Sequence, residues 1–205
     1  MENFSKTGKF QSFYLSNFMK INIIIFGFSG SGKSTIAKLL GKELGMRVIH
    51  PSSILKELIQ GETLGLNNSK AGTGFWESDE GIQLFKNRLE EKQPIDFVCD
   101  DILLKELEEG NIVMDSWTMP WIAKSGLKVY LKANKKIRIN RVAKRSNISK
   151  HLANQVITMK DNETRNLYIK HKGFDIKKDL HVFDLIINTD NSSPKEIGVK
   201  ILESI

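Results

Sequence analysis

One stretch decides the fold of this chain: Gly27-Phe28-Ser29-Gly30-Ser31-Gly32-Lys33-Ser34-Thr35. It fits the pattern G-x-x-x-x-G-K-[ST], in which glycines let backbone N–H groups point at phosphate oxygens where a helix begins. In this pattern the lysine reaches the β and γ phosphates, and the Ser34 hydroxyl is a hard oxygen ligand for Mg²⁺. We therefore expect these residues to bind ATP, with Lys33 catalytic and Ser34 a magnesium ligand.

The segments on either side of this loop have the pattern that a P-loop requires. Before it, residues 21–26 are apolar and mostly β-branched apart from Asn22, as expected for a strand buried on both faces of a parallel sheet. After it, apolar residues recur at helical spacing over Lys33–Leu44, and Gly45 supplies a helix stop. A chance match to the motif lacks this setting, so ATP with Mg²⁺ is the expected ligand pair.

Strand and helix patterns alternate along the rest of the chain. Strands are expected at Arg47–Ile49, 111–115, 127–131 and Leu185–Asn188, and helices at 52–58 (capped by Ser52 or Ser53), 77–91, 96–109, 135–145, 149–171 and Pro194–Leu202. This alternation predicts a three-layer α/β fold of the P-loop NTPase class, with a five-stranded parallel sheet. We expect a single domain over residues 19–205.

Length, composition and charge narrow the class of protein. The chain has 205 residues, 40% of them hydrophobic, which suits one domain with one core. It has no run of about 18 apolar residues that could span a bilayer. The single cysteine, Cys99, cannot form an internal disulfide, so a reducing, cytoplasmic location is expected. Although the net charge is +7, acidic residues are spread through the chain, and we expect a monomer with no nucleic-acid partner.

The first 18 residues have two interpretations. They lack the continuous apolar segment of a secretory signal and contain no arginine, so neither a signal peptide nor a transit peptide is supported. Met19 is followed at once by Lys20 and the first strand. Residues 1–18 are therefore either a short tail or a consequence of a mis-assigned start, with translation beginning at Met19.

A second carboxylate-bearing strand follows the pattern of a magnesium site. The apolar run Ile112-Val113-Met114 ends in Asp115. A strand of this kind delivers its last side chain to the carboxyl edge of the sheet, where ligands of α/β proteins bind. Asp115 is thus a candidate Mg²⁺ ligand, acting through water. The alternative is an aspartate that caps the turn after the strand.

A basic helix is the third candidate part of the site. Within 135–150 the chain has seven Lys or Arg residues and no Asp or Glu. Arg138, Arg141 and Arg145 lie at positions i, i+3 and i+7, so they share a helix face. Since a phosphoryl group in transfer needs cations around its equatorial oxygens, we expect all three to be catalytic. The alternative is a solvated cationic face.

In order and spacing, these motifs resemble the nucleoside monophosphate kinases, and most of all the archaeal-type cytidylate kinases. The resemblance covers most of the chain after Met19. It rests on the P-loop and on residues 110–115, 127–133, 138–145, 165–176 and 183–189.

The resemblance implies both an architecture and a reaction. It implies a P-loop core, a helical flap that binds the nucleoside monophosphate at about 52–91, and a lid at about 145–172. Closure of the lid excludes water and so suppresses ATP hydrolysis. The implied reaction is ATP- and Mg²⁺-dependent transfer of a phosphoryl group to CMP or dCMP, giving CDP or dCDP, without a covalent enzyme intermediate.

Departures from the family's pattern lie where the acceptor binds. Lys56 stands where the flap helix usually has an arginine, which removes a bidentate fork. Asp115-Ser116-Trp117 stands for Glu-Gly-Arg, and Leu167-Tyr168 for Arg-Tyr. Arg165, one turn after Asp161, could still reach inward. The expected acceptor-binding residues are therefore Lys56, Trp117 and Arg165.

Two tryptophans near the third strand have two interpretations. Trp117 and Trp121, with Pro120 between them, could stack on a ligand, or they could belong to the core. The second interpretation is the more common for paired tryptophans.

Two other functions fit the same sequence. The first is a P-loop kinase for another small acceptor, since Lys56, Trp117 and Leu167 all differ from the family where selectivity resides. The second is an ATP-binding regulatory or nucleic-acid-associated protein without kinase activity, in which residues 135–150 contact the partner.

Overall fold

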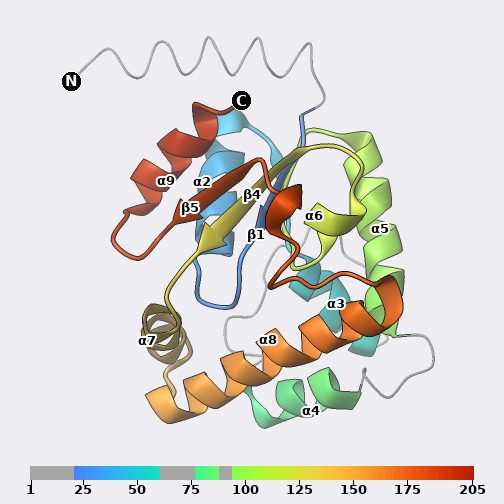
Figure 1. Cartoon of the computed structure of the whole chain (residues 1–205), viewed down its shortest axis with the longest axis vertical. Coiled ribbons are helices and arrows are strands. Elements are labelled where there is room, and N and C mark those ends of the chain that lie inside the picture. Colours follow the sequence, from blue (N-terminus) through green and yellow to red (C-terminus); the bar gives the residue numbers. More distant parts are fainter. Residues whose placement is uncertain (1–20, 61–76, 88–93) are drawn as a thin grey trace.

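A computed structural model describes residues 21–60, 77–87 and 94–205 of the chain. Within these ranges the strands form one parallel sheet in the order β2-β3-β1-β4-β5 (Figure 1). Their bounds are β1 Ile23–Phe26, β2 Arg47–Ile49, β3 Ile112–Asp115, β4 Leu127–Lys132 and β5 Leu185–Asn188. The predicted five-stranded parallel sheet is confirmed.

The helices alternate with these strands along the chain. They are α2 Lys33–Leu44, α3 Pro51–Gln60, α4 Asp79–Asn87, α5 Ile95–Glu109, α6 Met119–Ile122, α7 Lys135–Ser146, α8 Lys150–Lys172, the 3₁₀ helix η2 Leu180–Val182, and α9 Pro194–Leu202. Every helix expected in the described ranges is present. The additional elements α6 and η2 are too short to show a helical period in the sequence.

One helix start was predicted wrongly. α3 begins at Pro51, so Ser52 and Ser53 lie inside its first turn and do not precede it as caps. Proline is favoured at the first helical position because its fixed φ fits the helix and its missing N–H has no intrahelical partner there. The strand therefore passes into the helix directly after His50, the last residue before Pro51.

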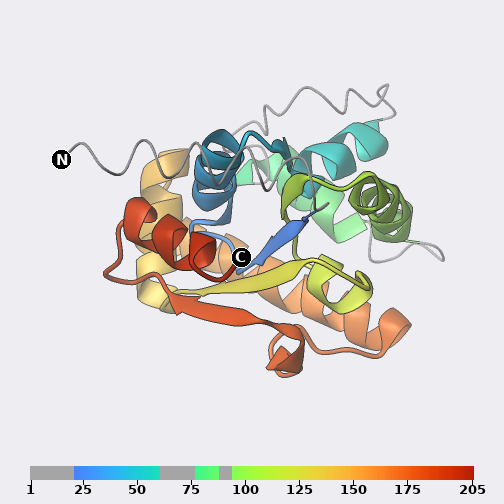
Figure 2. The same cartoon turned by 90° about the horizontal axis from the view of Figure 1, so that it is seen from above.

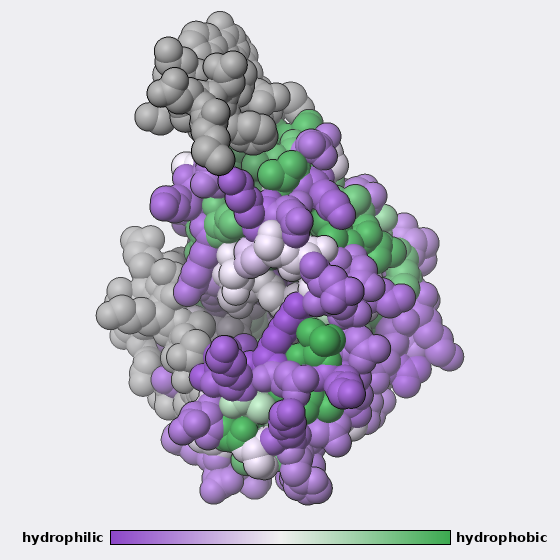
Figure 3. Space-filling view, turned by 90° about the vertical axis from the view of Figure 1, so that its left-hand side faces the viewer, coloured by the Kyte–Doolittle hydropathy of each residue, from purple (hydrophilic) through white to green (hydrophobic). Residues whose placement is uncertain are grey.

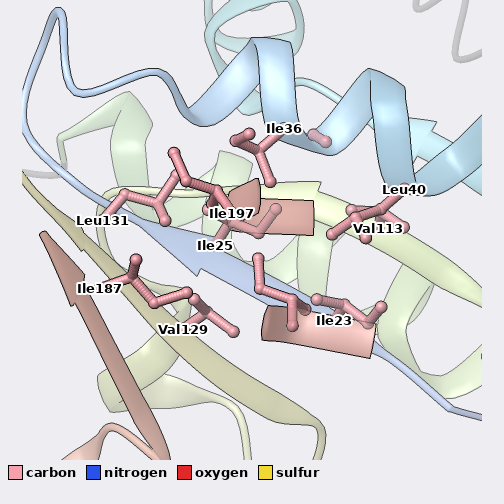
Figure 4. Packing of buried hydrophobic residues seen from close by; sticks show 11 residues of the cluster. Ile23, Ile25, Ile36, Leu40, Val113, Val129, Leu131, Ile187 and Ile197 are labelled. Carbon is pink, nitrogen blue, oxygen red and sulfur yellow. The ribbon is translucent and has the colours of Figure 1, made fainter. Parts of the chain in front are cut away.

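Alternate residues of the strands cover the two faces of the sheet, because successive side chains point in opposite directions. On one face α2 and α9 pack against β1, with Ile36 and Leu40 of α2 facing Ile23 and Ile25 (Figure 4). On the other face α3, α5 and α6 pack against Ile24 and the residues next to it. Each such large side chain, fully buried, contributes about 1.5–3 kcal/mol. The result is the predicted three-layer fold, and Figure 2 shows α2 and α9 on one side of β1, β4 and β5.

An aromatic cluster closes the second face beside α6. Phe26 of β1 contacts Trp121, and Trp121 stacks on Phe174 with ring centroids 5.4 Å apart and planes at 4°. The Trp121 Nε1–H donates to the carbonyl oxygen of Asp179 at 2.8 Å, so its polar atom is satisfied. For Trp121 the core interpretation is therefore confirmed.

The carboxyl ends of the strands meet the long helix α8, which crosses below the sheet in Figure 1 with α4 packed against it. α7 packs on the first part of α8. The side of the molecule that carries α7 and α9 is mainly hydrophilic (Figure 3). None of the helices in the described ranges is long and apolar enough to cross a membrane.

Two of the expected segments lie wholly or partly outside the described residues. The tail 1–18 is not described, and neither are positions 61–76 and 88–91 of the expected flap. α3 and α4 are the described helical parts of the flap range, and α8 fills most of the lid range.

Candidate active site

A cavity of about 690 Å³ lies at the carboxyl edge of the sheet. Its wall combines the P-loop with side chains from α3, α5, α8 and the end of β3. The loop and the start of α2 line one part of it, and apolar residues such as Leu55, Phe85 and Leu103 line another part. One cavity therefore joins the predicted phosphate-binding loop to a second, more apolar compartment.

The P-loop owes its shape to its glycines. Gly30 and Gly32 have φ values of 82° and 104°, in the left-handed region that side chains disfavour. A Cβ on Gly30 would lie 2.7 Å from the backbone oxygen of Arg138, so the loop is packed closely against α7. The first hydrogen bond of α2 runs from the N–H of Ile36 to Gly32 O. The loop thus leads directly into a helix N-terminus, as anion binding requires.

The side chain of Lys33 folds back over the P-loop. Its Nζ donates to the carbonyl oxygen of Gly27 and lies 5.4 Å from the ring centroid of Trp117. Burial lowers the pKa of Lys33 to about 8, although the nearby Asp115 carboxylate acts in the opposite direction. A phosphate anion beside the ammonium would favour its charged form. This lysine therefore lies where an anionic ligand improves its electrostatic environment.

Ser34 and Asp115 meet at the end of β3, as predicted from their positions in the chain. The Ser34 hydroxyl donates to Asp115 Oδ2 at 2.5 Å, and His50 Nδ1 lies 3.0 Å from Asp115 Oδ1. A hydroxyl and a carboxylate are oxygen donors of the kind that Mg²⁺ prefers. Among the described residues no group of three His, Cys, Asp or Glu could enclose a metal ion. The described residues thus offer two oxygen groups, Ser34 and Asp115, to a cation at this place.

All three predicted arginines have partners within the protein, and two of them, Arg138 and Arg141, contact the P-loop. Arg138 forms a buried pair with Asp161, with Nη2 to Oδ2 at 2.8 Å, and its Nη1 donates to the Ser29 carbonyl at 3.4 Å. Arg141 donates to the carbonyl oxygen of Thr189 at 2.6 Å and to that of Gly30 at 3.3 Å. Arg141 borders the cavity, whereas Arg138 does not. In this conformation both brace the P-loop.

Arg145 borders the cavity together with a lysine that the sequence analysis missed. Glu77 is buried and accepts from Lys160 Nζ at 2.9 Å and from Arg145 Nη2 at 3.2 Å. Lys160 is only 6% exposed. Lys160 could have been found from its position on α8. It lies two turns before Tyr168, which belongs to the family's pattern, and on the same face of the helix.

The apolar compartment contains a buried carboxyl group that the sequence analysis also missed. Asp100 of α5 accepts from the Tyr168 hydroxyl at 2.7 Å and from the Thr118 hydroxyl at 3.0 Å. Burial raises the pKa of Asp100 to about 7, although these two hydrogen bonds act in the opposite direction. Asp100 was not singled out because its partners are brought to it from distant parts of the chain.

The three predicted acceptor-binding residues do not converge. Trp117 borders the cavity beside Lys33. Lys56 does not border the cavity, and neither does Arg165. Instead, Arg165 forms a bidentate pair with Asp175, with Nε to Oδ1 at 2.7 Å and Nη2 to Oδ2 at 2.5 Å, and this pair lowers the pKa of Asp175 to about 2.

A P-loop at the centre of a parallel sheet, followed by a lysine, a hydroxyl and a strand-end aspartate in one cavity, defines a P-loop kinase. The chain belongs to the cytidylate kinase-like family, whose model matches residues 22–191. It is by class a nucleoside monophosphate kinase.

Curated relatives agree with this family over nearly their whole length. The chain is 37% identical over 185 residues to the cytidylate kinase of Sulfurisphaera tokodaii, covering 89% of this chain and 93% of the relative. It is 31% identical over 179 residues to the cytidylate kinase of Ignicoccus hospitalis, covering 85% and 93%. The resemblance identified from the sequence is confirmed.

Solved structures agree on the fold. The shikimate kinase of Acinetobacter baumannii, in complex with shikimate, has a TM-score of 0.55 at 18% identity, covering 94% of this chain and 96% of that one. A protein of Eubacterium ventriosum has a TM-score of 0.64 at 14% identity, covering 91% and 98%. At these identities the likeness concerns the fold alone.

Proposed function

We propose that this protein transfers the γ-phosphoryl group of ATP, with Mg²⁺, to CMP or dCMP, giving CDP or dCDP. The observation that carries the proposal is the single cavity that joins the P-loop to the compartment around Asp100. The relatives named cytidylate kinases support the choice of acceptor.

At the donor end, the chain's own groups match the charge of a triphosphate. The P-loop N–H groups and Lys33 would hold the β and γ phosphates, and Ser34 and Asp115 would hold Mg²⁺, directly or through water. The bound ion neutralises charge on the β and γ oxygens. Arg145 and Lys160, which border the same cavity, would add positive charge opposite Lys33.

At the acceptor end, Asp100 suits a base that carries an exocyclic amino group. An ionised carboxylate only accepts hydrogen bonds, so it attracts the amino group of cytosine and repels the corresponding carbonyl of uracil. The hydroxyls of Thr118 and Tyr168 fix the carboxyl group, and Leu55 and Leu103 are apolar walls for the ring. The compartment thus favours CMP over UMP.

In the proposed reaction the protein mainly positions the two nucleotides, and its side chains form no covalent bonds with them. A phosphate oxygen of the acceptor attacks the γ-phosphorus in line, the bond from that phosphorus to the β–γ bridging oxygen breaks, and ADP leaves. No side chain forms a bond to phosphorus. We propose residues 52–91 as the acceptor flap and 145–172 as the lid, with residues 1–18 outside the kinase domain, and closure would exclude water from the transfer.

A panel of acceptors tests this function. Purified protein with ATP and Mg²⁺ is incubated with CMP, dCMP, UMP, AMP and GMP, and diphosphate formation is followed by chromatography. We expect kcat/KM for CMP or dCMP to be about tenfold or more above that for the other three, as one decisive polar contact provides. EDTA should abolish turnover. Failure with every acceptor would overturn the proposal.

Asp100→Asn tests the assignment of the base compartment. An amide presents N–H donors as well as an oxygen, so it tolerates the carbonyl of uracil. At pH 8, where a carboxyl group of pKa about 7 is largely ionised in the native protein, we expect the CMP-to-UMP ratio of kcat/KM to fall by about 10–100-fold.

The exposed neighbour Asp101 provides the matched control for this experiment. Asp101→Asn makes the same chemical change on the same helix, and the ratio should stay within about twofold of the native value, as for a surface substitution. An unchanged ratio in Asp100→Asn would show that another group reads the base.

A P-loop kinase for a different small acceptor is the second candidate. It is favoured by Trp117, which borders the cavity beside Lys33 where the family's pattern has an arginine. Leu167 stands at the other position where the family's pattern has an arginine. It is buried and carries no charge that could replace that arginine. This candidate predicts little turnover with CMP or dCMP and faster turnover with another nucleoside monophosphate or a small metabolite.

A further inference from the structure

His50 has no part in the reaction as described above, yet it lies in the wall of the same cavity. It is the residue after β2, and the pairing of Ile49 with Met114 places it next to Asp115 of the neighbouring strand. Its side chain is 2% exposed and that of Asp115 is 6% exposed. A histidine this deeply buried needs partners for both ring nitrogens.

The first ring nitrogen has its partner in the structure. Nδ1 of His50 lies 3.0 Å from Asp115 Oδ1. A carboxylate only accepts, so Nδ1 carries the hydrogen. The other oxygen, Oδ2, accepts from the Ser34 hydroxyl at 2.5 Å. Asp115 is thus held by one donor from α2 and one from the end of β2, which fixes the plane of its carboxylate.

The second ring nitrogen has no hydrogen-bond partner among the described residues. Nε2 is buried, and in the neutral ring with the hydrogen on Nδ1 it accepts a hydrogen bond. Buried polar atoms are nearly always hydrogen-bonded, to protein or to an ordered molecule. His50 borders the cavity, so the partner that we consider for Nε2 is an occupant of the cavity.

The expected occupants of the cavity, ATP and hydrated Mg²⁺, differ in whether they can donate a hydrogen bond to Nε2. Phosphate oxygens only accept, so they would repel the lone pair of Nε2. Mg²⁺ usually keeps several of its water molecules, and such water is a strong donor. Groups that orient metal ligands from behind are a regular part of metal sites.

We propose that His50 is a positioning residue of the magnesium site: Nδ1–H orients the Asp115 carboxylate, and Nε2 accepts a hydrogen bond from a water molecule bound to Mg²⁺. The inference rests on the proposed binding of ATP with Mg²⁺. It concerns the affinity for the ion, and it adds no new step to the transfer.

Two near-isosteric variants separate the two nitrogens. His50→Asn keeps an N–H donor near Nδ1 and removes the atom near Nε2, whereas His50→Gln keeps a polar atom near Nε2 and removes the donor to Asp115. Calorimetry measures Kd for ATP with EDTA and with Mg²⁺, in the absence of acceptor. The ratio of the two Kd values gives the gain in affinity due to the ion.

We expect both variants to bind ATP in EDTA as the native protein does. The gain in affinity due to Mg²⁺ should fall by about 10–100-fold, as it does when a group that orients a metal ligand is replaced. His181→Asn, at an exposed histidine of η2, should keep the full gain. A gain within twofold of native in both variants overturns the inference. A loss confined to one variant overturns the role of the nitrogen that the other variant lacks.

Nuclear magnetic resonance of the native protein tests the same assignment without a substitution. The ¹⁵N signal of His50 Nε2 should be that of an unprotonated acceptor, and it should shift when ADP with Mg²⁺ replaces ADP with EDTA. A shift that appears only on addition of CMP would assign the donor to the acceptor nucleotide and overturn the role of the water. If native protein binds ATP equally with and without Mg²⁺, the proposed function itself fails.

Discussion

Lys33→Met is expected to lower kcat for CMP phosphorylation by about 10³-fold, as the loss of a cation that stabilises a developing charge does. Methionine keeps an unbranched apolar side chain, but it removes the ammonium that contacts the Gly27 carbonyl oxygen and the Trp117 ring. Steady-state kinetics with saturating ATP and CMP measures the effect. Because the charge that Lys33 would stabilise develops in the transition state, most of the loss should appear in kcat.

Lys42→Met is the matched control, since Lys42 is an exposed lysine in the last turn of the same helix. Its kcat should stay within about twofold of the native value, as for a neutral surface change. If Lys33→Met retains more than about a tenth of native kcat, the P-loop lysine does not act on the transferred group. Nucleic-acid binding by residues 135–150, if the regulatory alternative holds, would be unaffected.

Arg138→Leu is expected to destabilise the fold by about 3–5 kcal/mol, because it leaves the Asp161 carboxylate buried without its partner. Both side chains are less than 10% exposed, and Arg138 also donates to the P-loop at Ser29. For a chain of this size roughly 2–4 °C of melting temperature is lost per kcal/mol. Urea unfolding followed by circular dichroism gives the free energy directly.

Two further variants serve as controls for the prediction about Arg138→Leu. The double variant Arg138→Leu/Asp161→Leu removes both charges and should recover much of the loss, since no charge is then left unpaired. Glu109→Ala breaks the pair between the exposed Glu109 and the half-exposed Arg47 and should cost less than about 1 kcal/mol. A cost below 1 kcal/mol for Arg138→Leu would show that the buried pair is not needed for stability.

The fold could be predicted because its signals are local in the sequence. The apolar run before Gly27 and the helical period after Lys33 each depend on neighbouring residues, and the same holds for Leu185–Asn188 and Pro194–Leu202. The start of α3 could not be placed by the same logic, since Ser52 and Ser53 resemble caps and Pro51 is equally able to begin a helix.

The site could be predicted only where strand ends bring its residues together. Ile25 pairs with Asp115 across the sheet, so the last residue of β3 and the loop after β1 must meet. No comparable rule predicts which residues will contact the side chains on one face of a helix. Arg138 and Arg145 lie on one face of α7, yet Arg138 turns to Asp161 and Arg145 to Glu77, which depends on how α8 and α4 pack.

Asp100 shows the same limit. Its charge and position on α5 give no hint that hydroxyls from Thr118 and Tyr168 converge on it. Only the packing of α8 across the carboxyl edge makes it part of a cavity wall.

Glu77 ties together two segments that we propose to move. It lies in the flap range, whereas its partners Arg145 and Lys160 lie in the lid range, and Glu77 and Lys160 are each at most 6% exposed. Separating a buried charge from its partner is expensive unless another charge takes its place. In the described conformation Glu77 therefore holds Arg145 and Lys160 together, and we expect bound phosphate oxygens to compete with its carboxylate for those two cations.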